Sequence, residues 1–442
     1  MDVILIKAAQ LLLSLSLLVI IHEFGHFMFA RLFKTRVEKF YLFFDPWFSL
    51  FKVKKGDTEY GIGWLPLGGY VKISGMIDES MDKEAMKLPP QPHEFRAKKT
   101  WQRLLIMIGG VLMNFILAFI IYIGILYAWG EQYLPNENVK YGIEVDSIGE
   151  KIGLQNGDKI LSVGNHEVEN FRKIIPTLIL DNAKDIQVER NGQKVNVEIS
   201  DSDVALLIKS KGPMTFRIPF NYKVGKVAKN SAAQEAGLQP GDRILGMSDQ
   251  TFEFNDQFKA TLRDSIGKTV ALNVQRDSQS LTLPMTIPET GLLGIVLDYD
   301  LSKVFEYKTI RYGFFESIPA GIDRGISTIQ DYLKQFRLIF SSTTKGYESL
   351  GGFIAIGNIF PGAWNWHDFW NMTAFLSIIL AVMNLLPIPA LDGGHVMFLL
   401  YEMVTGRKPG DKFMEYAQIT GMVLLLTLVL YANFNDIFKL FK

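Results

Sequence analysis

The chain carries His22-Glu23-Phe24-Gly25-His26 at the end of an apolar run, 4–21, in which Lys7 is the only charged residue. Residues four apart share one face of an α-helix, so both imidazoles can reach one metal ion with Glu23 beside its bound water. The same five letters also occur by chance on polar surface helices. Charged side chains in a bilayer helix cost about 2.5 to 3.5 kcal/mol each on insertion scales, so we predict a metal site inside a membrane.

Composition agrees with a membrane protein of several domains, since the chain has 442 residues of which 48% are hydrophobic. The formal net charge is zero, so no basic field indicates a nucleic-acid partner. The chain has no cysteine, which excludes disulfides, thiolate zinc ligands and a thiol nucleophile. Histidine and carboxylate side chains must therefore hold any metal.

Four apolar runs predict about four transmembrane helices. The first, 3–33, is longer than a signal-peptide core, and no clear small-residue cleavage site precedes His22, which disfavours the signal-peptide alternative. The others are 104–127, 372–386 and 417–432, and a shorter run, 396–404, follows a proline-rich break. Lysine and arginine concentrate at 34–103, which predicts that this loop is cytoplasmic and that 129–370 and both termini lie on the opposite side.

A nine-residue stretch in the long segment between spans occurs twice. Gly153-Leu154-Gln155-Asn156-Gly157-Asp158-Lys159-Ile160-Leu161 returns as Gly237-Leu238-Gln239-Pro240-Gly241-Asp242-Arg243-Ile244-Leu245, and alternating strands follow at 186–199 and 269–274. The repeat predicts two β-rich α+β domains, 129–215 and 216–295, that resemble PDZ domains. Such domains bind a peptide C-terminus or an extended segment along a sheet edge. The alternative is a pair of steric spacers.

A second group of polar residues lies near the C-terminus, in Asn384-Leu385-Leu386-Pro387-Ile388-Pro389-Ala390-Leu391-Asp392-Gly393-Gly394-His395. A site with two histidines takes a third protein ligand, commonly a carboxylate, and Asp392 is the best candidate. The prolines break the helix, and irregular backbone at membrane depth implies surrounding protein or a wet cavity. The alternative is a kinked helix followed by an Asp-Gly turn at the membrane edge.

Together these motifs resemble the site-2 protease family of intramembrane zinc metalloproteases, most closely its bacterial sigma-E-regulating type. The resemblance covers nearly the whole chain and includes Gly109-Gly110-Val111-Leu112-Met113-Asn114 in the second span and Pro66-Leu67-Gly68-Gly69-Tyr70-Val71-Lys72 in the loop before it. It implies that His22, His26 and Asp392 bind Zn²⁺ and that Glu23 is the general base. It gives His395 no ligand role.

The resemblance also implies how substrate is held. Asn384 is expected to contact substrate or stabilise the reacting centre, with a helix-capping residue as the alternative. The segment 60–74 alternates apolar residues with glycines, which predicts a hairpin or re-entrant loop near the membrane. We expect Gly68 and Gly69 to let its backbone approach an extended substrate, the alternative being a plain cytoplasmic turn.

The predicted architecture is therefore multi-domain. A helical polytopic membrane domain (1–128 and 371–442) contains the metal site and the hairpin, with the two PDZ-like domains inserted. Residues 296–370 form a helical segment, since 311–340 has the apolar spacing of an interfacial helix or of a helix packed on the PDZ-like pair.

The predicted function is zinc-dependent endopeptidase activity on single-span membrane proteins, either anti-sigma-factor-type substrates or remnant signal peptides. The resemblance implies a bacterial inner membrane, with the active site towards the cytoplasm and the PDZ-like pair gating access from outside it. Two alternatives are a membrane-embedded metal-dependent transporter or sensor, and a non-catalytic PDZ scaffold. A transporter should show more polar residues inside the membrane and inverted repeats.

Overall fold

The computed structural model describes residues 3–66, 68–76, 89–210, 212–298, 300–344 and 346–440. Leu67 of the predicted substrate loop, and Lys83 and Lys87 of the basic loop, lie outside the described residues. The chain divides into two compact units: a membrane unit (Met1–Glu131, Arg311–Phe336 and Leu350–Lys442) and a repeat unit (Gln132–Ile310 and Arg337–Ser349).

Four helices of the membrane unit are long and apolar enough to cross a bilayer, within the described residues, which confirms the predicted number of spans. They are α1 (Val3–Leu32), α3 (Thr100–Ala128), α11 (Trp366–Leu385) and α13 (Asp411–Leu440). A helix that is apolar on all sides is typical of a membrane span. The shorter α12 (Asp392–Thr405) covers the run predicted at 396–404 and ends at Gly406, which has the left-handed φ of +70° common at helix ends.

Close glycine contacts hold α1 against α3. A Cβ on Gly109 would lie 2.6 Å from the carbonyl oxygen of Gly25, and one on Gly25 would lie 2.8 Å from the Cα of Gly110. Small residues let helix backbones approach closely where lipid gives no hydrophobic drive for association. Helix α3 also packs against α11 and α12, so it is the central helix of the unit.

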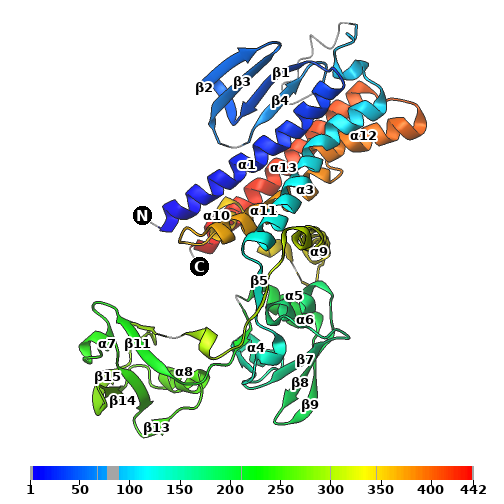
Figure 1. Cartoon of the computed structure of the whole chain (residues 1–442). Helices are drawn as coiled ribbons and strands as arrows, with labels where there is room; N and C mark the ends of the chain where they lie inside the picture. Colours follow the sequence, from blue (N-terminus) through cyan, green and yellow to red (C-terminus); the bar gives the residue numbers. More distant parts are fainter. Residues whose placement is uncertain are drawn as a thin grey trace. The chain divides into compact units, whose positions relative to one another are not determined.

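A four-stranded sheet lies beside the C-terminal end of α1, and α1 begins at the opposite end of the helical bundle (Figure 1). The strands of this sheet are β1 (Val37–Leu42), β2 (Phe44–Lys55), β3 (Thr58–Leu65) and β4 (Tyr70–Ile73), and their order across the sheet is β2-β3-β1-β4. Strands β2 and β3 form a hairpin: they pair antiparallel around a turn at Gly56, whose φ is +64°.

The prediction of a hairpin within 60–74 is wrong. The two strands of the predicted hairpin correspond to β3 and β4, but these do not pair with each other. Strand β1 lies between them, parallel to β3 and antiparallel to β4. The alternation of side chains in a strand does not indicate its neighbour, and here the neighbour comes from earlier in the chain.

Helix α9 (Phe314–Phe340) confirms the helical spacing of 311–340. Its buried residues Ser317, Gly321 and Gly325 are spaced by four and share one face. A Cβ on Gly321 would lie 2.7 Å from the main-chain nitrogen of Ile123 in α3. The small-residue face of α9 therefore packs on the membrane bundle, and Phe315 on another face is 81% exposed. A short helix, α10 (Phe353–Asn358), follows and packs against α13.

The repeat unit consists of two halves with a similar order of elements. In the first half these are β6 (Ile143–Val145), α4 (Ser147–Lys151), β7 (Lys159–Val163), α5 (Ile174–Leu180), β8 (Asp185–Arg190), β9 (Gln193–Glu198), α6 (Asp201–Lys209) and β10 (Met214–Phe216). In the second half they are β11 (Tyr222–Val227), α7 (Ala232–Glu235), β12 (Arg243–Met247), β13 (Gln250–Thr251), α8 (Asn255–Asp264), β14 (Thr269–Arg276), β15 (Gln279–Thr286) and β16 (Ile295–Leu297). Helix α6 occurs only in the first half and β13 only in the second. Each half has its own apolar core.

In both halves the last strand pairs antiparallel with the first: β10 with β6, and β16 with β11. The predicted domain ends at 215 and 295 therefore cut through the closing strand of each half. The predicted strand 186–199 is two strands, β8 and β9, joined by a tight turn with Asn191 at φ +51°. Each closing strand is only three residues long, which is too short to give a recognisable alternating pattern in the sequence.

The repeated Gly-Asp motif forms the same buried ion pair in each half. Asp158 pairs with Arg190 at 2.7 Å, and Asp242 pairs with Arg276 at 2.7 Å. Each arginine also donates to the carbonyl oxygen of the motif's first glycine, at 2.8 Å from Gly153 and 2.8 Å from Gly237. The arginine thus ties the turn to a neighbouring strand, and the repeat reflects a structural requirement of the fold.

Arg276 holds the pKa of Asp242 below its usual range through their hydrogen bond, which outweighs the opposing effect of burial. The carboxylate therefore stabilises the second half at neutral pH, and that contribution is lost as the pH falls through the lowered pKa. We expect Arg276→Met to destabilise this half by more than an exposed ion pair contributes, because it leaves the buried carboxylate of Asp242 without its charged partner. Hydrogen exchange of β12 and β14 in the full chain measures the loss of protection.

Lys223→Met is the matched control, because its ion pair with Asp298 is more than half exposed on both sides. Exposed pairs contribute about 1 kcal/mol or less. Equal loss of protection in the two variants would contradict the structural role of the repeated aspartate.

Candidate metal centre

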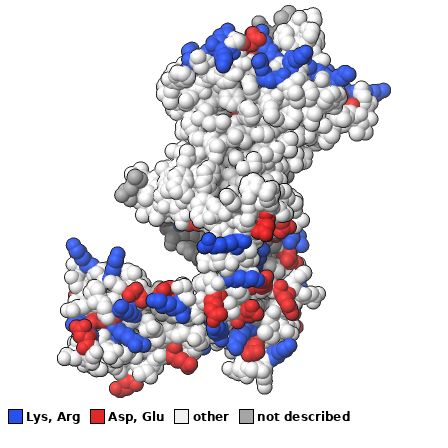
Figure 2. Space-filling model, in the orientation of Figure 1, with Lys and Arg blue, Asp and Glu red and all other residues white. Residues whose placement is uncertain are grey.

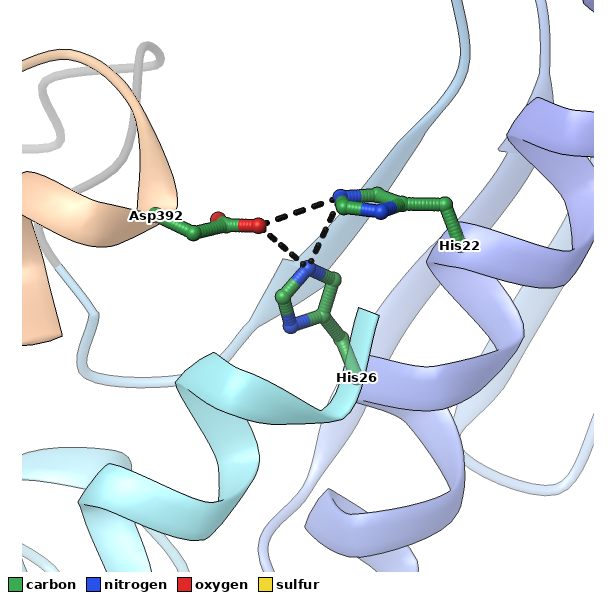
Figure 3. A group of neighbouring side chains, drawn as sticks. All are labelled: His22, His26 and Asp392. Carbon is green, nitrogen blue, oxygen red and sulfur yellow. Dashed lines mark hydrogen bonds and ion pairs between the residues drawn. The ribbon is translucent and has the colours of Figure 1, made fainter. Parts of the chain in front are cut away.

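Helix α1 and the first residue of α12 bring His22, His26 and Asp392 together (Figure 3). The Nε2 atoms of the two histidines are 3.3 Å apart, and Asp392 Oδ2 lies 3.1 Å from that of His22 and 3.3 Å from that of His26. The imidazoles are buried and the carboxylate is mostly buried. Within the described residues, these are the only three His, Cys, Asp or Glu side chains that approach one another closely enough to share a metal ion.

The separations of these three atoms fit a tetrahedral zinc site. Zinc bonds of about 2.0 to 2.1 Å place neighbouring ligand atoms about 3.3 to 3.4 Å apart. Asp392 Oδ2 is buried and has no hydrogen-bond partner, and the Nε2 atoms of the two imidazoles face it. Converging acceptor atoms in a buried site repel one another unless a cation lies between them, so the donor set suits zinc.

The partner of His26 on its far side fixes which nitrogen faces the centre. Its Nδ1 lies 2.8 Å from the carbonyl oxygen of Ile106 in α3. A carbonyl oxygen only accepts, so Nδ1 must carry the proton and Nε2 of the neutral ring presents a lone pair. This is the usual arrangement of a metal-binding histidine, whose second nitrogen donates to the protein.

Gly110 leaves the space in which the two imidazoles lie. A Cβ on this residue would be 2.5 Å from His26 Nε2 and 2.7 Å from His22 Cε1. Asn114, one turn later on α3, lies with its amide 3.1 Å from His22 Nδ1. In the sequence, Gly110 and Asn114 stand out as interruptions of an apolar run and through the resemblance. The structure gives each a contact with the metal-facing histidines.

Two features place Asp392 at the start of α12. Ala390 has the left-handed φ of +87°, which turns the chain after the two prolines. A Cβ on Gly394 would lie 2.6 Å from the Cα of Pro389, so this glycine lets the helix start pack against the loop. The position also suits the charge, since a carboxylate in the first turn is stabilised by the helix dipole.

The other end of α12 is held by an ion pair that sequence analysis missed. Arg103 of α3 donates to Glu402 at 2.6 Å, and the two side chains are 9% and 11% exposed. The pair links the helix that carries Asp392 to the helix that carries the partners of both histidines. No short motif connects these residues, which are far apart in the chain.

The remaining predicted residues lie around the centre at different distances. The amide nitrogen of Asn384 is 3.4 Å from His22 Nε2, so Asn384 reaches the site. Glu23 is half-buried on the same helical turn as His22, and a Cβ on Gly69 would lie 3.5 Å from its Cγ. Gly68, with φ +147°, instead lies against the ring of Phe44.

The fold and the site define a class: a bundle of membrane-spanning helices that contains a His-Glu-x-x-His metal centre completed by a distant aspartate, as in zinc hydrolases. The family model of peptidase family M50 matches residues 10–428, and the chain belongs to this family.

Three relatives cover almost the whole chain. Protease RseP of Yersinia pestis is 30% identical over 99% of both chains. The regulator of sigma-E protease RseP of Escherichia coli (strain K12) is 29% identical over 98% of both chains. A protein of Treponema pallidum whose name assigns it to the zinc metalloproteases is 27% identical, over 97% of this chain and 98% of its own length.

The protein is therefore a membrane-bound, zinc-dependent metalloprotease, as the sequence predicted. Neither alternative, a metal-dependent transporter or a non-catalytic scaffold, is supported by these relatives.

Gly110→Ala tests the space that the metal centre needs. Because the added Cβ would overlap both imidazoles, we expect zinc affinity to fall at least about tenfold, as for other changes around metal ligands. Competition with a chromophoric chelator measures the dissociation constant of zinc from the purified protein.

Gly124→Ala is the matched control, because it lies on the same helix and its Cβ would meet no atom within 4 Å. Wild-type zinc affinity in Gly110→Ala would show that zinc binding does not require the two imidazoles to lie against Gly110.

Proposed function

We propose that the chain hydrolyses peptide bonds of single-span membrane proteins within or near the bilayer. His22, His26 and Asp392 hold the zinc ion, and Glu23 is the general base. The main support is the convergence of three metal-facing atoms, 3.1 to 3.3 Å apart, between α1 and α12 of a membrane bundle.

Zinc bound by these residues lowers the pKa of a coordinated water and polarises the scissile carbonyl. Glu23 follows His22 directly, and its side chain lies beside Gly69. Its carboxylate accepts a proton from the attacking water and donates it to the leaving amine. Asn384, close to His22 Nε2, donates a hydrogen bond from its amide to the oxygen of the scissile carbonyl.

The edge strand β4 is our candidate for the element that receives substrate. A helical substrate hides its carbonyl groups in intrahelical bonds, so it must be extended before attack. Among the described strands, β4 pairs only with β1, which leaves its other edge open. Gly69 at its start lies next to Glu23. An extended substrate paired with β4 would be held beside the general base.

The distribution of charge supports an active site towards the cytoplasm. Lys and Arg side chains gather at the end of the membrane unit that carries the sheet, next to a nearly uncharged region (Figure 2). By the positive-inside rule we infer that this end faces the cytoplasm, and the bacterial relatives suggest that the membrane is a bacterial inner membrane. Since α3 crosses once, the chain after Ala128 emerges on the extracytoplasmic side.

The repeat unit is proposed to act as a PDZ-like gate on that side. In the second half β16 is an edge strand, next to β11. Val296 within this strand and Leu292 shortly before it are 60% and 73% exposed. A peptide C-terminus or an extended segment could add to this edge and leave its side chains against apolar surface. Binding there would select substrates by sequence or size before they reach the membrane site.

The names of the relatives suggest the substrate class. The proteases from Yersinia and Escherichia coli are named RseP, and the latter is named as a regulator of sigma-E protease. We therefore propose anti-sigma-factor-type membrane proteins as substrates, with remnant signal peptides as a second group.

Glu23→Gln separates proton transfer from metal binding. Loss of the general base should lower cleavage of a single-span model substrate by about 10² to 10⁴-fold, while the zinc content stays at that of the wild type. Reconstituted wild type and variant are compared by gel analysis of the substrate and by elemental analysis of the protein.

Glu306→Gln serves as the control, because this glutamate is 75% exposed in the repeat unit. Cleavage by Glu23→Gln at the wild-type rate would exclude Glu23 as the base. Loss of zinc from Glu23→Gln would instead indicate that Glu23 helps to bind the metal ion.

A further inference from the structure

Asn114 is a fully buried amide at the centre of the helical bundle. Its side chain has no exposed area, its amide nitrogen lies 3.1 Å from His22 Nδ1, and its main-chain oxygen accepts a hydrogen bond of 2.8 Å from Ser377 of α11. Neither the composition of the span nor the need for a third zinc ligand accounts for this residue.

The hydrogen-bonding chemistry of the pair requires the amide oxygen to face the ring. If His22 binds metal through Nε2, its Nδ1 carries the proton and is a donor. An amide nitrogen facing that position would place two donors together. Asn114 Oδ1, meanwhile, is buried without a partner.

Exchange of the oxygen and nitrogen positions, which differ little in shape, removes the contact between two donors and gives the oxygen a partner, while the amide nitrogen takes the former place of Oδ1. Oδ1 then lies where the ring can donate to it. The buried oxygen and the ring proton satisfy each other, as buried polar groups in proteins almost always do.

The two histidines differ in what orients them. The partner of His26 is the carbonyl oxygen of Ile106, a main-chain group that any residue at position 106 supplies. The partner of His22 is a side chain and depends on the residue at position 114. Of the two orienting partners, only that of His22 can therefore be removed by a side-chain substitution.

We propose that Asn114 is a positioning residue of the zinc site. By accepting the Nδ1 proton of His22 it holds the ring in the tautomer whose Nε2 lone pair faces the metal. This inference rests on the proposed roles of His22, His26 and Asp392. Without the acceptor, the ring also populates the tautomer with a proton on Nε2, which cannot bind zinc.

Asn114→Leu and Asn114→Asp together test the proposal. Leucine has a similar volume and no acceptor, so zinc affinity should fall about 10- to 100-fold, the usual effect of losing such a partner. Aspartate restores an acceptor and should keep the affinity within a few-fold of wild type. The readout is the dissociation constant of zinc from the full chain, by chelator competition, supported by the visible spectrum of the cobalt-substituted protein.

Thr373→Val is the matched control, since Thr373 is equally buried and its hydroxyl donates to Phe369 of its own helix. It should leave zinc affinity unchanged. If leucine and aspartate weaken binding equally, or if leucine has no effect, the positioning role is overturned. Rescue by aspartate distinguishes this role from general damage to the fold.

Asp392→Asn, measured in parallel, separates this proposal from the proposed function. A normal affinity in Asn114→Leu together with a loss of zinc in Asp392→Asn would overturn the role of Asn114 alone. A normal affinity in both variants would overturn the ligand assignment as well.

Discussion

The structure depends on one physical constraint: two imidazole nitrogens and a carboxylate oxygen must converge inside a bundle of apolar helices. Each of these groups is expensive to bury without a partner. A cation at their centre removes the repulsion among them, and their separations of 3.1 to 3.3 Å suit zinc. The positions of α1, α3 and α12 follow from this requirement.

Helix α3 meets that requirement through both its small and its polar residues. Gly109 lets α1 approach and Gly110 leaves room for the rings. The carbonyl oxygen of Ile106 and the side chain of Asn114 lie at the far nitrogens of the two histidines. Arg103 then fixes α12, which carries the aspartate. One helix thus connects ligands that are 370 residues apart, from His22 to Asp392.

Sequence patterns predicted the features that depend on local periodicity, such as the membrane spans, and those that depend on residue chemistry, such as the metal ligands. The spacing of His22 and His26, the four apolar spans, and the distant Asp392 with its following glycines could all be recognised. The pairing of β4 with β1 could not, because strand order depends on contacts distant in sequence. The orienting role of Ile106 is likewise invisible, since a main-chain oxygen leaves no signature in the sequence. Asn114 did have one, as an amide in an apolar run.

X-ray absorption at the zinc edge, on the zinc-loaded wild type and on Asp392→Asn, tests most directly whether these three residues bind one metal ion. In the wild type we expect zinc to be bound by two imidazoles, with bonds to nitrogen and oxygen of about 2.0 to 2.2 Å. In Asp392→Asn, zinc should bind more weakly and lose one oxygen ligand. Unchanged occupancy and coordination in Asp392→Asn would contradict the convergence of these three residues on one metal ion.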